Sequence, residues 1–254
     1  MGKVIINSDD FGYSRGVNYG ILDAYRLGIL TSTTVMANMP GFDHAVSLKN
    51  DYPNLGVGVH LTLTCGEPLL SNVATLTEGR RFRPLKDYQE GCDIDYDELY
   101  QEWNAQIQRV YRAGIVPTHL DSHHHTHTFG KNQEVVVALA QKYDLPVRGN
   151  FSLATSVRHT TYFEALFDEV GVDNQADSLL DVDLAVYLEE LIRTLQTRES
   201  TEIMCHAAYL DQLLYRQSSF LYPRINQVEF LIHSDFAKKV MKDSQIELIT
   251  YSEL

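Results

Sequence analysis

The sequence predicts an α/β fold, and within that class a distorted (β/α) barrel of about seven parallel strands that forms a single domain over residues 1–254. Short apolar, β-branched segments alternate with amphipathic segments of helical period along most of the chain. The strand segments are nearly continuously apolar, which is typical of parallel strands covered by helices. Seven strands are close to the eight of a closed barrel, and α/β barrels of this length commonly fold as one domain.

The first half of the chain alternates between strand and helix. Residues 3–8 form a β-branched apolar run that predicts a strand. Residues 14–28 place apolar side chains at near-helical spacing and end at Gly28, a common helix stop, so they predict a helix. The same patterns predict, in order, a strand over 31–38, a helix over 42–49, a strand over 56–64, an amphipathic helix over 95–113 and a strand over 117–122.

The second half continues this alternation less regularly. Its predicted elements are, in order, a helix over 133–143, a strand over 145–148, helices over 162–169 and 184–196, a strand over 202–208, a helical region over 226–242 and a last strand over 246–251. Two insertions, around residues 65–94 and 150–161, show no strong period. Because loops that follow strands build the active site in such barrels, both insertions are candidate substrate loops.

Composition argues against several kinds of partner. The chain has 21 Lys and Arg against 34 Asp and Glu, a formal charge of −13 and no basic patch, so we expect no nucleic-acid partner. It has no apolar run long enough to span a bilayer and no signal-peptide pattern after Met1, so we expect no membrane partner. Cys65, Cys92 and Cys205 lack C-x-x-C spacing, which indicates a reducing, cytoplasmic location.

Two adjacent carboxylates, Asp9 and Asp10, end the first predicted strand. Such a pair at the end of an apolar strand repels itself and loses hydration, so a metal ion, a proton or a cationic partner must compensate. The alternative is that one of them caps the following helix. The pair is therefore a candidate for metal binding or for acid–base chemistry.

A histidine-rich segment ends the predicted strand over 117–122. In an extended chain His119, Asp121 and His123 share one face, and imidazole with carboxylate is a suitable ligand set for a divalent ion. His125 and His127 would share that face if the strand continued. The alternative is a solvated histidine-rich loop, but the run follows an apolar strand, and we predict a metal site.

Further polar residues lie near other strand ends. His60 lies in an apolar strand, where a lone histidine is usually a core residue, but the neighbouring histidine run makes it a candidate ligand. His206 could be a core residue, a fourth ligand or a general acid, and we favour the acid. Arg148 would reach the same edge of the sheet, where it could pair with a carboxylate or form a surface salt bridge. We predict Arg148 and His125 as substrate-binding residues.

The sequence lacks the motifs of several common enzyme classes. It has no G-x-S-x-G elbow, no Walker loop and no dinucleotide-binding glycine fingerprint. Metal-assisted hydrolysis fits the remaining residues: the ion polarises a carbonyl, an aspartate takes the proton of water and a histidine protonates the departing group.

Six motifs, in this order along nearly the whole chain, resemble the YdjC/ChbG family of carbohydrate deacetylases. They are residues 7–12 (NSDDFG), 17–21 (VNYGI), 31–34 (TSTT), 56–61 (GVGVHL), 118–127 (THLDSHHHTH) and 204–206 (MCH). The resemblance implies a distorted (β/α) barrel, one divalent metal ion (magnesium or zinc) and often a homodimer. It also implies the removal of acetyl groups from N-acetylglucosamine units, as in chitobiose.

The resemblance also implies roles for single residues. Three positions match metal ligands: Asp10, His60 and His123. Asp9 would be the general base, by similarity to the more distant NodB-type deacetylases, and His206 would act on the leaving amine. One position departs from the family pattern, because Ala207 follows His206 where the family often has proline.

Two other functions stay open from the residues alone. The chain could be a metal-dependent hydrolase of another bond, such as a phosphoester or a different amide. It could also be a metal-dependent sugar-binding protein without catalysis. Asp9 beside Asp10, together with His206, argues against the second, because binding alone requires neither a base nor an acid. Two segments, residues 65–94 and 150–180, match the family least, and they would select the sugar.

Overall fold

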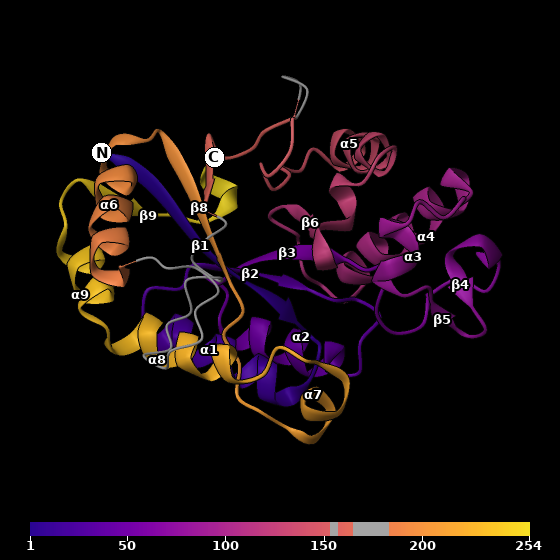
Figure 1. The fold of residues 1–254 in the computed structure, drawn as a ribbon, viewed down its shortest axis with the longest axis horizontal. Helices are drawn as coiled ribbons and strands as arrows, with labels where there is room; N and C mark the ends of the chain where they lie inside the picture. Colours follow the sequence, from indigo (N-terminus) through magenta and orange to yellow (C-terminus); the bar gives the residue numbers. More distant parts are fainter. Residues whose placement is uncertain (153–156, 165–182) are drawn as a thin grey trace.

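The computed structural model describes residues 1–152, 157–164 and 183–254. Within these ranges one parallel sheet contains β1 (Gly2–Phe11), β2 (Ser32–Val35), β3 (Gly56–Leu61), β6 (Leu120–Ser122), β7 (Tyr162–Glu164), β8 (Ser200–Cys205) and β9 (Ile246–Leu248). The strand order is β6-β3-β2-β1-β8-β7, and β9 pairs with the first residues of β1. The sheet curls into a half-barrel, which confirms the predicted distorted (β/α) barrel (Figure 1).

Helices surround this sheet. They are α1 (Arg15–Leu27), α2 (Phe42–Asp51), α3 (Leu85–Gln89), α4 (Tyr96–Arg112), α5 (Asn132–Tyr143), α6 (Leu184–Thr197), α7 (Gln212–Gln217), α8 (Tyr222–His233) and α9 (Asp235–Lys242). Figure 1 shows α6, α8 and α9 along one side of the strands and α4 and α5 at the other. Both termini lie at the same end, where Nζ of Lys3 donates to the carbonyl of Glu253. In the described part of the chain, no helix is long and apolar enough to cross a membrane.

Local sequence explains most of these elements. β1 carries Val4, Ile5 and Ile6, all fully buried, because strands lie on both sides of it and helices cover the sheet. In α4 the apolar stripe predicted from a helical period is buried in the core, and its N-terminal amides are capped by the side chain of Asp95.

The side chain of His119, which directly precedes β6, packs closely against β3. A Cβ added at Gly58 in β3 would lie 2.5 Å from ring atoms of His119, so only glycine leaves room for that imidazole. The His119 ring in turn stacks on Tyr251 of the C-terminal 3-10 turn η3 (Tyr251–Glu253), with ring centroids 3.7 Å apart. The glycine-rich motif of β3 therefore serves packing inside the barrel.

Three predicted elements differ from the structure. Residues 162–164 form β7, paired with β8, where a helix was expected; the rest of that predicted helix lies outside the described residues. A short run containing Tyr162 and Phe163 suits a strand once a partner strand is beside it. The predicted strand over 145–148 makes a single bridge, between Leu120 and Val147. The helical region over 226–242 is two helices, because Ser234 ends α8 and its side chain caps α9.

The insertion around 65–94 has secondary structure of its own. It contains the 3-10 turn η1 (Ala74–Leu76), the hairpin of β4 (Thr77–Glu78) and β5 (Arg81–Phe82), and α3. Two acidic side chains of α4 attach it: Glu102 accepts the backbone amides of Leu69 and Leu70, and Glu98 accepts the amide and hydroxyl of Thr75. Part of the second insertion, residues 153–156, lies outside the described residues.

Candidate active site

A cavity of about 880 Å³ opens at the carboxyl ends of the strands. Its lining includes Asp9, His123, His125, His206 and Arg224. Cys65 and Asn150 bring the starts of the two insertions to this cavity, as expected for substrate loops. The end of α7 and the segment after it, residues 217–220, also line the cavity, and no sequence pattern had indicated these residues.

A β-bulge separates the two adjacent carboxylates. The pairing of β1 with β2 shifts register between Ser8 and Phe11, and Asp10 has a left-handed backbone with φ 73°. Such a conformation is uncommon for residues other than glycine and costs free energy, so its occurrence at a strand end is typical of a functional site. Because the bulge interrupts the simple alternation of an ideal strand, Asp9 can line the cavity while Asp10 reaches His123, which also lines it.

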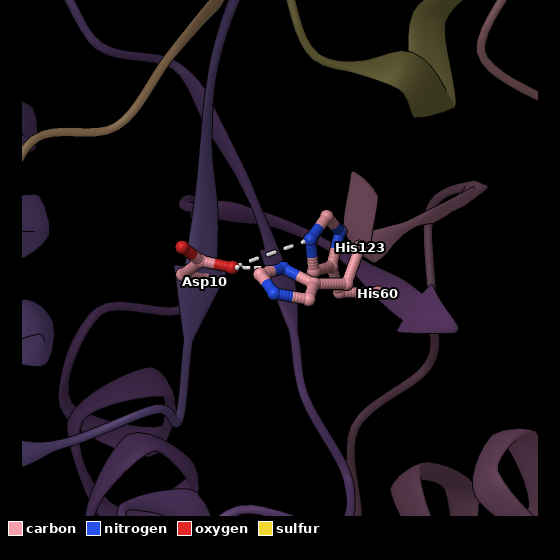
Figure 2. A group of neighbouring side chains, drawn as sticks. All are labelled: Asp10, His60 and His123. Atoms are coloured by element: carbon pink, nitrogen blue, oxygen red, sulfur yellow. Dashed lines mark ion pairs between the residues drawn. The ribbon is translucent and has the colours of Figure 1, made fainter. Parts of the chain in front are cut away.

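Asp10, His60 and His123 form a compact buried cluster (Figure 2). Oδ1 of Asp10 lies 3.0 Å from Nδ1 of His123 and 3.4 Å from Nε2 of His60. The potential ligand atoms of the three residues all lie within 4.8 Å of one another. This cluster could hold a metal ion, as the sequence predicts for these three residues.

The chemistry of the three groups fits a cation. Oδ1 of Asp10 and Nε2 of His60 are buried and make no hydrogen bond within the described residues. A carboxylate oxygen that faces imidazole nitrogens with no proton or ion between them has unsatisfied lone pairs, which is costly away from water. A proton or a divalent ion placed among them removes this cost, and mixed imidazole and carboxylate ligands suit several divalent ions.

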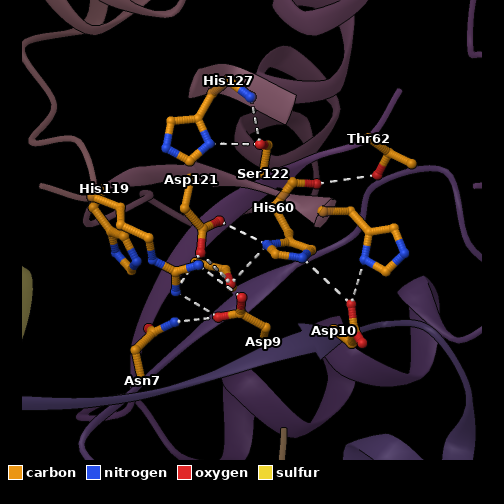
Figure 3. Close-up of polar contacts among 12 residues, drawn as sticks. Asn7, Asp9, Asp10, His60, Thr62, His119, Asp121, Ser122 and His127 are labelled. Carbon is orange, nitrogen blue, oxygen red and sulfur yellow. Dashed lines mark hydrogen bonds and ion pairs between the residues drawn. The ribbon is translucent and has the colours of Figure 1, made fainter. Parts of the chain in front are cut away.

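Asp121 lies behind His60 and orients it (Figure 3). Nδ1 of His60 lies 2.8 Å from Oδ1 of Asp121, and Oγ1 of Thr34 donates to the other oxygen at 3.0 Å. Since a carboxylate can only accept, His60 donates through Nδ1 and directs Nε2 towards Asp10, a common support for a metal-binding histidine. Burial lowers the pKa of His60, but Asp121 and Asp9 outweigh it and raise the pKa to about 10. The cluster therefore attracts positive charge.

Asp9 has different partners, chiefly Arg148. Nη1 and Nη2 of Arg148 donate to the two oxygens of Asp9 at 2.8 and 2.6 Å, and Asn7 donates to Oδ1 at 2.9 Å. These donors use three of the roughly four acceptor positions of a carboxylate, which leaves one. Burial raises the pKa of Asp9, but the guanidinium of Arg148 overcomes this and holds the pKa well below its usual range. Asp9 is therefore ionised at neutral pH.

A second group of possible metal ligands lies around Arg148. Asp9, His60 and Asp121 lie close enough together to resemble another metal site. However, Nη2 of Arg148 lies 2.6 Å from Asp9 and 2.8 Å from Asp121, so a cation is already present there. In the cluster of Asp10, His60 and His123, the guanidinium of Arg224 contacts Oδ2 of Asp10 and leaves Oδ1 facing the two imidazoles, so this cluster is the better candidate for a metal ion.

The histidine run does not continue as a strand. β6 ends at Ser122, and residues 123–128 form the 3-10 turn η2 (His123–Thr128), in which His124 and His125 have φ of 56° and 53°. The extended-chain argument that grouped His125 and His127 with His123 therefore does not apply. Both ring nitrogens of His127 are engaged, Nδ1 with Ser122 at 2.6 Å and Nε2 with Asn150 at 2.9 Å.

His125 and His206 both line the cavity. His125 packs edge-on against Phe163, and burial lowers the pKa of His125 to about 3, so its imidazole is neutral at pH 7. His206 follows β8, its backbone amide donates to Gln227 of α8, and its ring packs edge-on against Phe220. A positive charge on His206 would lower the pKa of Asp9 further, and both residues line the cavity.

Sequence reasoning missed three residues of this network. Arg224 donates through Nη2 to Oδ2 of Asp10 at 2.7 Å. Glu202 accepts from Nε of Arg148, and Tyr251 donates its hydroxyl to Glu202. The charge of Glu202 within an apolar strand was the one available signal, because a buried carboxylate requires a partner. Arg224 on a helix and Tyr251 near the C-terminus have no comparable local signal.

The comparisons with known proteins agree with this geometry. A model of the YdjC-like protein family matches residues 3–242. The chain belongs to the YdjC-like family. The predicted family and the prediction of an enzyme are thus confirmed.

YdjC-like relatives match over nearly the full length of the chain. "Carbohydrate deacetylase" of Halalkalibacterium halodurans is 43% identical and covers 94% of this chain and 98% of its own. "Chitooligosaccharide deacetylase" of Proteus mirabilis is 37% identical and covers 99% and 98%. A solved structure from Enterococcus faecalis V583, provisionally described as a cellobiose-phosphate cleavage protein, aligns with a TM-score of 0.85 at 32% identity, over 99% of this chain and 98% of that one.

Proposed function

We propose that this protein removes acetyl groups from N-acetylated sugars, such as N-acetylglucosamine oligomers, and uses one divalent ion held by Asp10, His60 and His123. The observation that carries this proposal is the buried cluster of these three residues, one of which, His123, lines the same cavity as the ionised Asp9. The names of the YdjC-like relatives support the sugar and the bond.

The chain's own residues would divide the reaction between them. When bound, a divalent ion, magnesium or zinc, would polarise the acetyl carbonyl and lower the pKa of water. Asp9 has one acceptor position left after Arg148 and Asn7, and there it takes the proton of the attacking water. His206, which also lines the cavity, donates a proton to the amine nitrogen as the C–N bond breaks. Acetate and a free amine result.

We assign the two predicted substrate-binding residues differently. His125 lines the cavity with a neutral imidazole, so it can exchange hydrogen bonds with a sugar. Arg148 is fully buried and engaged by carboxylates, so we propose that it acts on substrate only through Asp9. Homodimer formation and a cytoplasmic location stay predictions from the sequence.

Acetate release tests the proposed function. We expect metal-loaded protein to release acetate from N-acetylated glucosamine oligomers, and Asp10→Asn to release little. Mass spectrometry of a panel of N-acetylated, O-acetylated and phosphorylated sugars identifies the bond cleaved. Phosphate release far faster than acetate release would instead identify a phosphoester hydrolase, and binding of sugars without any cleavage would identify a sugar-binding protein.

A further inference from the structure

A buried line of polar contacts leads from the C-terminal turn to Asp9. Tyr251 donates its hydroxyl to Oε2 of Glu202. The other oxygen of Glu202 accepts from Nε of Arg148 at 2.9 Å, and the remaining donors of Arg148 reach both oxygens of Asp9. Tyr251, Glu202 and Arg148 are fully buried. Four residues from four distant parts of the sequence therefore form one continuous network.

The geometry of this network restricts Arg148. A guanidinium is planar, and its donors have a fixed arrangement, so holding Nε on one side sets the direction of Nη1 and Nη2 on the other. Glu202 holds Nε, and Asp9 receives the opposite pair of donors. Asp121 also holds Nη2, at 2.8 Å, but it does not contact Nε. If Glu202 moved, Nε would lose its partner, so the guanidinium plane could turn about Nη2 and the carboxylate of Asp9 could turn with it.

Tyr251 restricts Glu202 in the same way. Its hydroxyl fixes the oxygen of Glu202 that Arg148 Nε does not use, and its ring is clamped by stacking on His119 at an interplanar angle of 12°. The turn that carries Tyr251 is closed by a reciprocal capping box between Thr250 and Glu253. The stacked His119 ring thus holds the side chain of Tyr251, and the closed turn holds its backbone.

We propose that Glu202 and Tyr251 are positioning residues for the reaction: they hold the guanidinium of Arg148 in the plane that presents the carboxylate of Asp9 to the cavity. This inference rests on the proposed function for its effect on turnover. Neither residue lines the cavity, so neither touches substrate. They would contribute by keeping the carboxylate of Asp9 correctly oriented, because a small displacement of a general base can lower the rate greatly.

The test is Tyr251→Phe, which keeps the stacked ring and removes only the hydroxyl. We expect kcat to fall about tenfold, as for one lost hydrogen bond to a charged group, with KM and metal affinity unchanged. Tyr143→Phe is the matched control, because Tyr143 donates its hydroxyl to Asn104 at 2.7 Å and does not line the cavity. Glu202→Gln, which weakens the contact with Nε of Arg148, should lower kcat in the same way.

A double-mutant cycle distinguishes positioning from general support of the fold. In an Asp9→Asn background, Tyr251→Phe should have no further effect on the residual rate, because the group it orients is already disabled. A similar loss in both backgrounds, or an unchanged kcat in Tyr251→Phe, would overturn the proposal. If wild-type protein cleaves no acetylated sugar, the proposed function fails, and crystal structures still decide the positioning: Arg148 should be displaced in Tyr251→Phe but not in Tyr143→Phe.

Discussion

At the scale of single residues, Asp9 and Asp10 are neighbours in sequence with separate environments. Arg148 and Asn7 hold Asp9, whereas Asp10 faces His60 and His123. The bulge and the left-handed backbone at Asp10 produce this separation. We therefore expect neutral substitutions at the two positions to have different consequences.

Asp9→Asn should retain the divalent ion and lose most turnover, whereas Asp10→Asn should lose the ion first. Asn preserves the shape of Asp but removes its basicity, and a lost general base typically costs about 10²- to 10⁴-fold in rate. In Asp9→Asn, Arg148 keeps Asp121 and Glu202 as partners, so the fold should survive. Titration calorimetry with magnesium and zinc, together with kcat for each variant, checks both expectations. Loss of the ion in Asp9→Asn with retention in Asp10→Asn would reverse the two assignments.

At the scale of elements, α4 connects the site to the first insertion. Gln106 binds the amide and carbonyl of Thr62, just after His60 in the chain, and also donates to Glu102 at 2.8 Å. Glu102 in turn accepts the amides of Leu69 and Leu70. One face of a helix thus holds both the end of the strand that carries His60 and the start of a candidate substrate loop.

Glu102→Gln should loosen the insertion. The new amide places a donor where a buried acceptor is required, which costs about 1–3 kcal/mol of unfolding free energy. We expect urea unfolding at lower denaturant and faster proteolytic cleavage within residues 65–94. Glu90→Gln serves as a control, because Glu90 is exposed and its carboxylate pairs with Lys86 one helical turn away. Equal effects of the two substitutions would contradict the role of Glu102.

At the scale of the whole molecule, the barrel buries several charges around Arg148. Asp9, Asp121 and Glu202 all lie within 3 Å of its guanidinium nitrogens. Burial raises the pKa of Glu202, and although Arg148 and Tyr251 oppose this, the pKa reaches about 6 against an ordinary 4.5. Glu202 is therefore the carboxyl group beside Arg148 that we expect to gain or lose its proton near pH 6.

This pKa predicts a pH-dependent difference in stability. A carboxyl whose pKa is raised by folding stabilises the folded state below its unfolded-state pKa, and that contribution disappears as pH rises through the folded-state value. Between pH 4.5 and 6, wild type should lose about 2 kcal/mol of unfolding free energy relative to Glu202→Gln, which carries no such proton. Urea unfolding of both proteins across this range measures the difference. A difference in unfolding free energy that is constant, or that grows in favour of wild type as pH rises, would contradict a raised pKa of Glu202.

The sequence alone determined the alternation of strands and helices and the candidate metal ligands. Apolar period reports burial directly, so β1, β3, α1 and α4 were predictable, and Asp10, His60 and His123 are chemically unusual at apolar strand ends. The apolar pattern was less reliable where a short segment suits either a helix or a strand. Residues 162–164 form a strand because β8 lies beside them and pairs with them.

Only the tertiary structure decided which polar groups meet. Arg148 and Asp9 are 139 positions apart, and Glu202 and Tyr251 are 49 apart, so no local spacing records their contacts. The bulge at Asp10 and the turn at His124 likewise break the alternation on which a strand argument depends. The period of a sequence reflects burial of each segment by itself, whereas partners for buried charges are chosen by strand order and register, which exist only once the barrel has formed.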